Sequence, residues 1–126
     1  MQNLWAPWRM EYILGDRPKG CIFCPDGNGE TDEERLLLYR GELSMVVMNR
    51  FPYSNGHLLV APWNHSPSLD GLKNDELLDL IRTVRASVGV LRETMSPDGF
   101  NVGLNIGTVA GAGFEAHVHF HIVPRW

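Results

Sequence analysis

The segment His117-Val-His-Phe-His-Ile-Val-Pro-Arg-Trp126 guides the interpretation of the rest of this sequence. Successive side chains of a β-strand point to opposite faces of a sheet, with a period of two residues. A strand over residues 117–123 therefore places His117, His119 and His121 on one face and apolar side chains on the other. The apolar face is expected to pack on a core, and the histidine face is expected to form a site or a polar cleft.

Four further apolar runs predict the other strands, at residues 35–39, 44–48, 57–62 and 100–106. Gly41-Glu42 separates the first two runs and indicates a hairpin turn. Short connections of this kind favour antiparallel pairing. With one long helix added, the sequence predicts an α+β fold built on a mainly antiparallel, five-stranded sheet.

The long helix is predicted over residues 74–95. Asn74 is the expected N-cap, and Ser96-Pro-Asp-Gly99 is expected to end the helix. Apolar residues recur at helical spacing along one face, which we assign to core packing and not to chemistry. This face consists of Leu77, Ile81, Val84, Val88 and Leu91.

Length and composition favour a single domain over residues 1–126, with residues 1–20 as an N-terminal arm that wraps over the body or meets a partner chain. Hydrophobic residues make up 44% of the chain and charged residues 21%, which supports a folded core. The net charge of −4 argues against non-specific binding to nucleic acid. No apolar run reaches the ~20 residues that a membrane span needs, and the N-terminus does not resemble a signal peptide.

The histidine face has three interpretations. Partly buried, hydrogen-bonded histidines are the simplest, but three of the chain's five histidines alternate here. A three-histidine metal site is disfavoured, because four strand residues of ~3.3 Å each separate the outer two by ~13 Å. Nucleophilic catalysis fits better, since a neutral imidazole carries a lone pair and its second nitrogen can be held by a hydrogen bond.

Cys21-Ile-Phe-Cys24 is either a redox pair, two inert thiols or half of a zinc site that histidines complete. Two cysteines form no stapling framework for a small secreted protein, so a reducing compartment, the cytoplasm, is expected. The glycine-rich segment Gly107-Thr-Val-Ala-Gly-Ala-Gly113 is an ordinary loop or a backbone cradle for an anion. It lacks the Gly-Lys-Ser/Thr of a Walker motif.

His-x-His-x-His followed by apolar residues and Pro-Arg resembles the signature of the histidine-triad (HIT) family. Further segments that match in order are Cys21-Ile-Phe-Cys24, Asn49-Arg-Phe-Pro52, Gly56-His-Leu-Leu-Val-Ala-Pro62 and His65. Two more resemble a bacterial branch described as diadenosine tetraphosphate phosphorylase or hydrolase-like, namely Leu4-Trp-Ala-Pro-Trp-Arg-Met-Glu-Tyr-Ile13 and Ala110-Gly-Ala-Gly113.

The resemblance implies that His119 is the nucleophile and forms a nucleotidyl-histidine intermediate. His117 and His121 would flank the phosphate, and His57 would support them. The further implied substrate contacts are Asn49 near the ribose, Asn105 near the phosphates, and the backbone of Gly111, Ala112 and Gly113. Phe114 departs from the family pattern, which commonly has a hydroxyl residue three positions before the first triad histidine.

The resemblance also implies a structural zinc ion held by Cys21, Cys24, His65 and His117. It implies a homodimer whose sheet continues across subunits. The aromatic residues Trp5 and Trp8 are consistent with burial at such an interface. No organic cofactor is expected.

The expected reaction is cleavage of a dinucleoside polyphosphate at the α-phosphate, by hydrolysis or phosphorolysis, with a purine nucleotide as the ligand. The alternatives are a nucleoside phosphoramidate hydrolase, a non-catalytic nucleotide- or zinc-binding regulator, and a metallohydrolase. The chain ends just after the histidine segment, whereas relatives in the bacterial branch continue with a tail that is expected to influence substrate choice.

Overall fold

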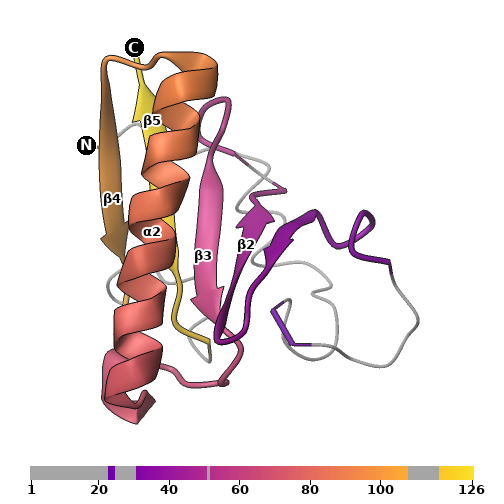
Figure 1. Cartoon of the computed structure of the whole chain (residues 1–126), viewed down its shortest axis with the longest axis vertical. Coiled ribbons are helices and arrows are strands. Elements are labelled where there is room, and N and C mark those ends of the chain that lie inside the picture. Colours follow the sequence, from indigo (N-terminus) through magenta and orange to yellow (C-terminus); the bar gives the residue numbers. More distant parts are fainter. Residues whose placement is uncertain (1–22, 25–30, 51, 108–116) are drawn as a thin grey trace.

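The computed structural model describes residues 23–24, 31–50, 52–107 and 117–126, and it confirms the predicted α+β class. Five antiparallel strands form one sheet in the order β1-β2-β3-β5-β4, and α2 lies across one face of it (Figure 1). The elements are β1 Leu37–Arg40, β2 Ser44–Met48, β3 Leu58–Pro62, a 3-10 turn η2 Leu69–Gly71, α2 Asn74–Met95, β4 Gly99–Leu104 and β5 Phe120–Arg125.

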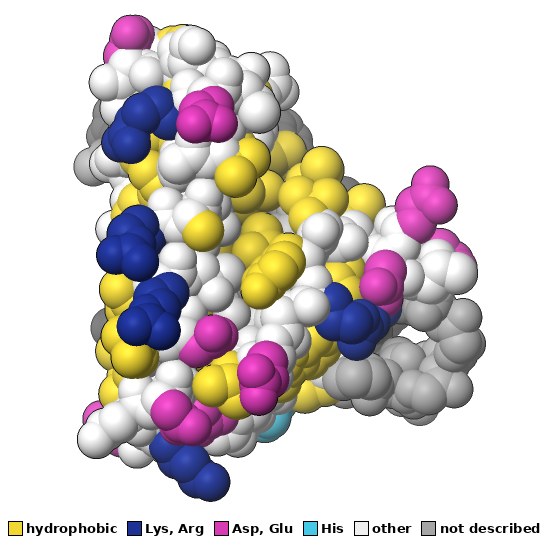
Figure 2. All heavy atoms as spheres, in the orientation of Figure 1, with side chains coloured by type: hydrophobic (Ala, Val, Ile, Leu, Met, Phe, Trp, Pro, Cys, Tyr) yellow, Lys and Arg dark blue, Asp and Glu magenta, His cyan; other side chains and the backbone are white. Residues whose placement is uncertain are grey.

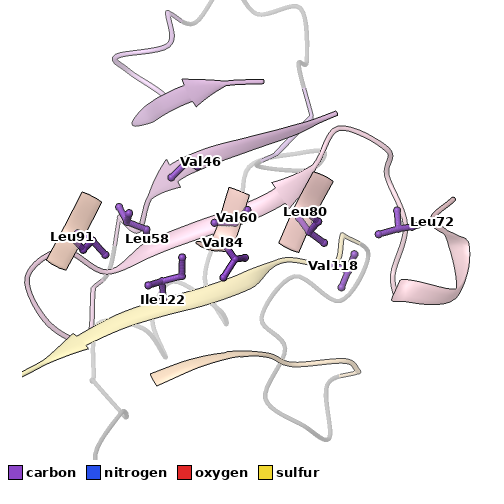
Figure 3. Packing of buried hydrophobic residues seen from close by; sticks show 9 residues of the cluster. All are labelled: Val46, Leu58, Val60, Leu72, Leu80, Val84, Leu91, Val118 and Ile122. Carbon is purple, nitrogen blue, oxygen red and sulfur yellow. The ribbon is translucent and has the colours of Figure 1, made fainter. Parts of the chain in front are cut away.

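The hydrophobic core lies between α2 and the sheet, where apolar side chains from β2, β3 and β5 face the helix (Figure 3). Its buried members are Val46, Leu58, Val60, Leu72, Leu80, Val84, Leu91, Val118 and Ile122. Burial of this many aliphatic side chains is the main favourable contribution to folding. A second cluster, Phe23, Leu37, Met45, Val47, Leu59 and Ala61, uses the alternate strand residues and therefore lies on the opposite face of the sheet.

The apolar face of α2 is confirmed except at one residue. Val84 and Leu91 are buried, and Leu77 and Val88 pack against the core, as the spacing predicts. Ile81, however, is 53% exposed, and Leu80 is fully buried in its place. Adjacent helical residues differ by about 100° in direction, so Ile81 lies just outside the stripe that Leu80 centres.

Both ends of α2 lie where the sequence predicts, but the N-cap differs. Lys73 is the N-cap residue and Asn74 is the first helical residue. The Glu76 carboxylate accepts a hydrogen bond from the Lys73 backbone N–H at 2.8 Å, which reproduces half of a capping box. Ser96 ends the helix in the left-handed conformation, with φ of 48°. The described residues include no helix that is long and apolar enough to span a membrane.

The histidine segment begins earlier than the strand that contains it. β5 starts at Phe120, so the prediction of a strand over residues 117–123 is wrong for its first three residues. The reason is that the Val118 backbone N–H donates to the Ser66 carbonyl, at 2.6 Å, and not to a neighbouring strand. The alternation nevertheless continues outside the strand, because Val118 packs in the same core cluster as Ile122.

In the space-filling view of the α2 side, Lys and Arg side chains stand along the outer surface of the helix, and only a small area of histidine is visible at the lower edge (Figure 2). In the described residues, the exposed arginines of this helix are Arg82, Arg85 and Arg92.

Candidate active site and metal centre

The histidines gather on the face of the sheet opposite α2. His121 on β5 pairs with Leu59 on β3, whose side chain belongs to the cluster on that face. Directly paired residues project to the same side of a sheet, so His121 lies there too. Ring contacts extend the group, since the His121 ring centroid lies 4.9 Å from that of His119 and 5.2 Å from that of His57.

His117, at one end of this group, meets Cys24 and His65, which come from distant parts of the chain. Cys24 Sγ lies 3.2 Å from His65 Nδ1 and 3.5 Å from His117 Nδ1. The two Nδ1 atoms are 3.1 Å apart. Among the described residues, these three form the one group of potential metal ligands whose donor atoms converge within 4.8 Å. We refer to Cys24, His65 and His117 as the metal end of the site.

The spacing of these three atoms fits a zinc ion. In a regular tetrahedron with Zn–S bonds of about 2.3 Å and Zn–N bonds of about 2.0–2.1 Å, neighbouring ligand atoms lie about 3.3–3.6 Å apart. The three distances between donor atoms, 3.1, 3.2 and 3.5 Å, are close to these edges. A cysteine with two histidines is also a donor set that zinc favours.

The surroundings of His117 direct its lone pair toward this point. Its Nε2–H donates to the Pro62 carbonyl at 2.8 Å, so the neutral ring carries its lone pair at Nδ1. Burial lowers the pKa of His117 to about 4, the hydrogen bond to Pro62 opposes that shift, and the nearby His65 and His119 add to it. A neutral histidine whose second nitrogen is held by a backbone carbonyl is the usual form of a metal ligand.

His119 is held in the opposite tautomer. Its Nδ1–H donates to the His117 backbone carbonyl at 2.9 Å, so the lone pair lies at Nε2. The Phe23 ring packs against His119 with its centroid 4.8 Å away, and it contacts His117 at 5.0 Å. Phe23 is fully buried and His119 is nearly so, which restricts the imidazole to one orientation. Such a ring is prepared to act as a nucleophile through Nε2.

At the other end, His121 and His57 form a hydrogen-bonded pair. The Tyr53 backbone N–H donates to His57 Nδ1 at 3.1 Å, and His57 Nε2 lies 3.0 Å from His121 Nδ1. The Tyr53 ring stacks on His57, with the centroids 5.0 Å apart and the planes inclined by 23°. His57 is almost completely buried, whereas Tyr53 and His121 are half-buried. We refer to Tyr53, His57 and His121 as the relay end.

A family model described as the HIT domain matches residues 30–126, which include all of the strands, α2 and every histidine. The chain belongs to the HIT family.

Relatives with named activities extend this result. The chain is 36% identical over 137 residues to the AP-4-A phosphorylase of Mycobacterium tuberculosis, an alignment that covers 100% of this chain and 69% of that protein. It is 32% identical over 105 residues to an adenosine 5'-monophosphoramidase of Schizosaccharomyces pombe, covering 83% of this chain and 74% of the relative. The C. elegans NitFhit protein has a similar structure, with a TM-score of 0.68 and 30% identity over 71% of this chain and 22% of that chain.

Of the residues expected to form the HIT site, the structure brings His57, His117, His119 and His121 into one group. Asn49 is buried beside them, and its Nδ2 lies 3.1 Å from His57 Nδ1. The expected ligands and contacts Cys21, Gly111, Ala112 and Gly113, and the departing residue Phe114, lie outside the described residues.

Asn105 lies at the end of β4 nearest the histidines. The antiparallel register pairs Leu104 with Phe120 and Gly103 with His121, so Asn105 follows the last pair on the side of His119. It is half-buried. This position is compatible with the phosphate contact that the HIT resemblance implies, because Asn105 and His119 both lie just beyond the same end of the paired strands β4 and β5.

Three residues of this site escaped the sequence analysis, namely Phe23, Tyr53 and Pro62. Phe23 lies between the two cysteines, and the Cys-x-x-Cys pattern makes no prediction for the residues inside it. The other two act partly through backbone atoms, whose partners depend on the fold and not on residue type. An aromatic residue four positions before His57 was a weak signal that could have pointed to Tyr53.

Proposed function

We propose that this HIT-family chain cleaves dinucleoside polyphosphates, such as diadenosine tetraphosphate, at an α-phosphate through a nucleotidyl intermediate on His119. One observation carries the proposal: the Nδ1–H of His119 is held by the His117 carbonyl, so the lone pair of the neutral ring lies on Nε2, the atom that would attack phosphorus. The phosphorylase relative acts on a substrate of this class by its name.

In the first step, His119 Nε2 forms a bond to the α-phosphorus, and the bond from phosphorus to the bridging oxygen breaks. The leaving polyphosphate takes that electron pair, and His121 Nε2–H would donate a hydrogen bond or a proton to phosphate oxygens. In the second step, water or inorganic phosphate attacks phosphorus, and the P–N bond breaks with its electron pair returning to His119 Nε2. The proton that an attacking water loses would pass to His121, if His121 has given one up, or to solvent. Proton transfer by a positioned histidine contributes about 10²–10⁴ in rate to reactions of this kind.

Substrate contacts extend from this centre toward the strand edges. We assign the ribose to Asn49, the phosphates to Asn105 and the backbone of residues 111–113, and the purine base to the region that precedes Asn49. Because Phe114 replaces the usual hydroxyl residue, the leaving group would depend on Asn105 and backbone amides.

A nucleoside phosphoramidate is the second candidate substrate, favoured by the similarity to the phosphoramidase. The same His119 attack would then break a P–N bond of the substrate, and the leaving amine would need a proton. We assign that proton to His121 Nε2–H at the relay end. The two candidates therefore differ in the leaving group and share the nucleophile.

The metal end would hold a structural zinc ion through Cys24, His65 and His117, with Cys21 as the proposed fourth ligand. Four protein ligands leave no open coordination position, so the ion would stabilise the fold and take no part in the reaction. His117 gives this ion a link to the nucleophile, because its ring would bind zinc while its carbonyl orients His119. A reducing compartment, the cytoplasm, would keep the Cys24 thiol available.

We also propose a homodimer that joins two β4 edges. β4 is the last strand of the sheet, and Asn101, Val102 and Gly103 on it are exposed. An exposed strand edge presents unpaired backbone groups that a second copy can satisfy.

Product analysis tests the function. Diadenosine tetraphosphate is incubated with the wild type, His119→Ala and His119→Gly, with and without phosphate, and an adenosine phosphoramidate serves as the second substrate. Turnover by the wild type that disappears in both variants supports the nucleophile. ATP with AMP indicates hydrolysis, and ATP with ADP that forms only with phosphate indicates phosphorolysis. Full activity in either variant excludes covalent catalysis by His119.

A further inference from the structure

The two nitrogen atoms of a neutral imidazole have opposite roles, because one donates a hydrogen bond and the other accepts one. Which atom carries the proton is therefore fixed once the partner of either atom can only donate or only accept. A backbone amide N–H can only donate, and a backbone carbonyl can only accept. Starting from Tyr53, this rule assigns the tautomers of the histidines at the relay end.

The Tyr53 backbone N–H reaches His57 Nδ1 at 3.1 Å, so Nδ1 must be the accepting atom. The Asn49 amide nitrogen lies 3.1 Å from Nδ1 and 3.3 Å from Nε2, so it does not distinguish the two ring nitrogens, and the Tyr53 amide decides the assignment. The proton of neutral His57 consequently lies on Nε2. That atom is 3.0 Å from His121 Nδ1 and donates to it.

His121 must then carry its own proton on Nε2. The neighbouring His119 has the reverse arrangement, since its Nδ1–H donates to the His117 carbonyl. Two histidines on one face, with ring centroids 4.9 Å apart, thus offer a lone pair at one Nε2 and an N–H at the other. The same side chain thus supplies the nucleophile at His119 and a hydrogen-bond donor at His121.

The Tyr53 ring adds a second constraint. It is stacked on His57 at 5.0 Å and lies 6.5 Å from His121, with the planes inclined by 23° and 30°. Near-parallel stacking limits rotation of both imidazoles and keeps their hydrogen bond aligned. The same residue therefore sets which His57 nitrogen is protonated and how the pair is oriented.

We propose that Tyr53 is a positioning residue for catalysis: its backbone N–H fixes the tautomers of His57 and His121, and its ring holds their planes, so that His121 presents an N–H to the phosphate beside the His119 lone pair. The role in catalysis rests on the proposed function, whereas the tautomers can be measured without substrate.

The test uses nitrogen NMR of the imidazole rings in the full, substrate-free chain, which separates protonated from unprotonated ring nitrogens. The wild type is expected to show protonated Nε2 in His57 and His121, and protonated Nδ1 in His119. An amide-to-ester replacement at residue 53 removes the N–H and keeps the ring. It is expected to abolish the single-tautomer pattern of both His57 and His121 and to lower kcat about tenfold with little change in KM.

Two side-chain variants complete the test. Tyr53→Phe keeps the amide and the ring, so it should retain the wild-type tautomers of His57 and His121. Tyr53→Leu keeps only the amide, so it should retain the tautomers and lose a few-fold in kcat. Thermal unfolding of each variant checks that the fold persists.

Protonated Nδ1 in wild-type His57, or unchanged patterns in a folded ester variant, would overturn the proposal. Equal kcat in Tyr53→Leu and the wild type would overturn the role of the ring. If His119 cannot be trapped as a nucleotidyl adduct while the tautomers match, the proposed function fails and the tautomer assignment stands. If a nucleotidyl adduct on His119 is trapped but Nδ1 of His57 carries the proton, the proposed function stands and the tautomer assignment fails.

Discussion

The metal end and the relay end of the site use the same residue type in opposite ways. At the metal end, His117 donates through Nε2 to the Pro62 carbonyl and turns the Nδ1 lone pair toward Cys24 and His65. At the relay end, His121 accepts at Nδ1 from His57 and carries its proton at Nε2. At the metal end, ligand lone pairs converge on one point. At the relay end, the hydrogen bond from His57 leaves an N–H on His121 Nε2, next to His119.

Backbone partners therefore assign the histidine roles in this protein. A carbonyl forces the facing nitrogen to carry a proton, and an amide forces it to carry a lone pair. Aromatic packing follows the same division, because Phe23 is buried against His117 and His119 whereas half-buried Tyr53 stacks on His57. Substitutions at each end should therefore have separable effects.

Phe23→Ala should give the largest change. Removing this fully buried ring leaves a cavity beside His117 and His119, and such truncations cost about 3–5 kcal/mol of unfolding free energy. Urea unfolding measures the loss, with Phe23→Leu as the matched control that should lose less. A Phe23→Ala protein as stable as the wild type would show that the ring does not support the two histidines.

His57→Ala should affect the relay end alone. Without His57, the hydrogen bond that holds the His121 tautomer is lost, and kcat on diadenosine tetraphosphate should fall about a hundredfold or more. Bound metal, measured by elemental analysis of the purified protein, should not change. Loss of metal from this variant would contradict the separation of the two ends.

His65→Ala should show the complementary pattern. Loss of one ligand should weaken binding of the proposed zinc ion, and kcat should fall about tenfold because the His117 carbonyl no longer holds His119 as firmly. A strong chelator should produce the same fall in the wild type, and His65→Cys should partly restore binding because cysteine is also a zinc ligand. Activity that vanishes with chelation and returns in proportion to any added divalent metal would instead favour a metallohydrolase.

Ile81→Ala should have the smallest effect, since this side chain is 53% exposed on α2 and remote from both ends in the described contacts. Its unfolding free energy should stay within about 0.5 kcal/mol of the wild type, with metal content and kcat unchanged. Leu80→Ala, one residue earlier and fully buried, should lose about 2–5 kcal/mol. Equal losses in the two variants would contradict the observed helix orientation.

Sequence periodicity predicted the architecture well, because an element that is buried on one side must carry apolar residues at the spacing of its own backbone. The ranges of β2 and α2 match the predictions, and the five strands pair antiparallel as expected. The errors at Ile81, the Asn74 cap and the start of β5 have different causes. Ile81 and the cap are local matters, since Leu80 centres the buried stripe and Glu76 accepts from the Lys73 backbone N–H three residues earlier. The start of β5 depends on the Ser66 carbonyl, which a local pattern does not specify.

Residue order alone is enough to put His117, His119 and His121 on one face, because alternation is a local property of extended backbone. It also supplies Cys24 and His65 as candidate donors, and the resemblance identifies the family. The protonated nitrogen of each histidine, in contrast, is set by contacts that form only on folding. Pro62, Tyr53 and the His117 carbonyl reach those rings through contacts between distant segments or through backbone geometry, and tautomers depend on such partners rather than on residue type.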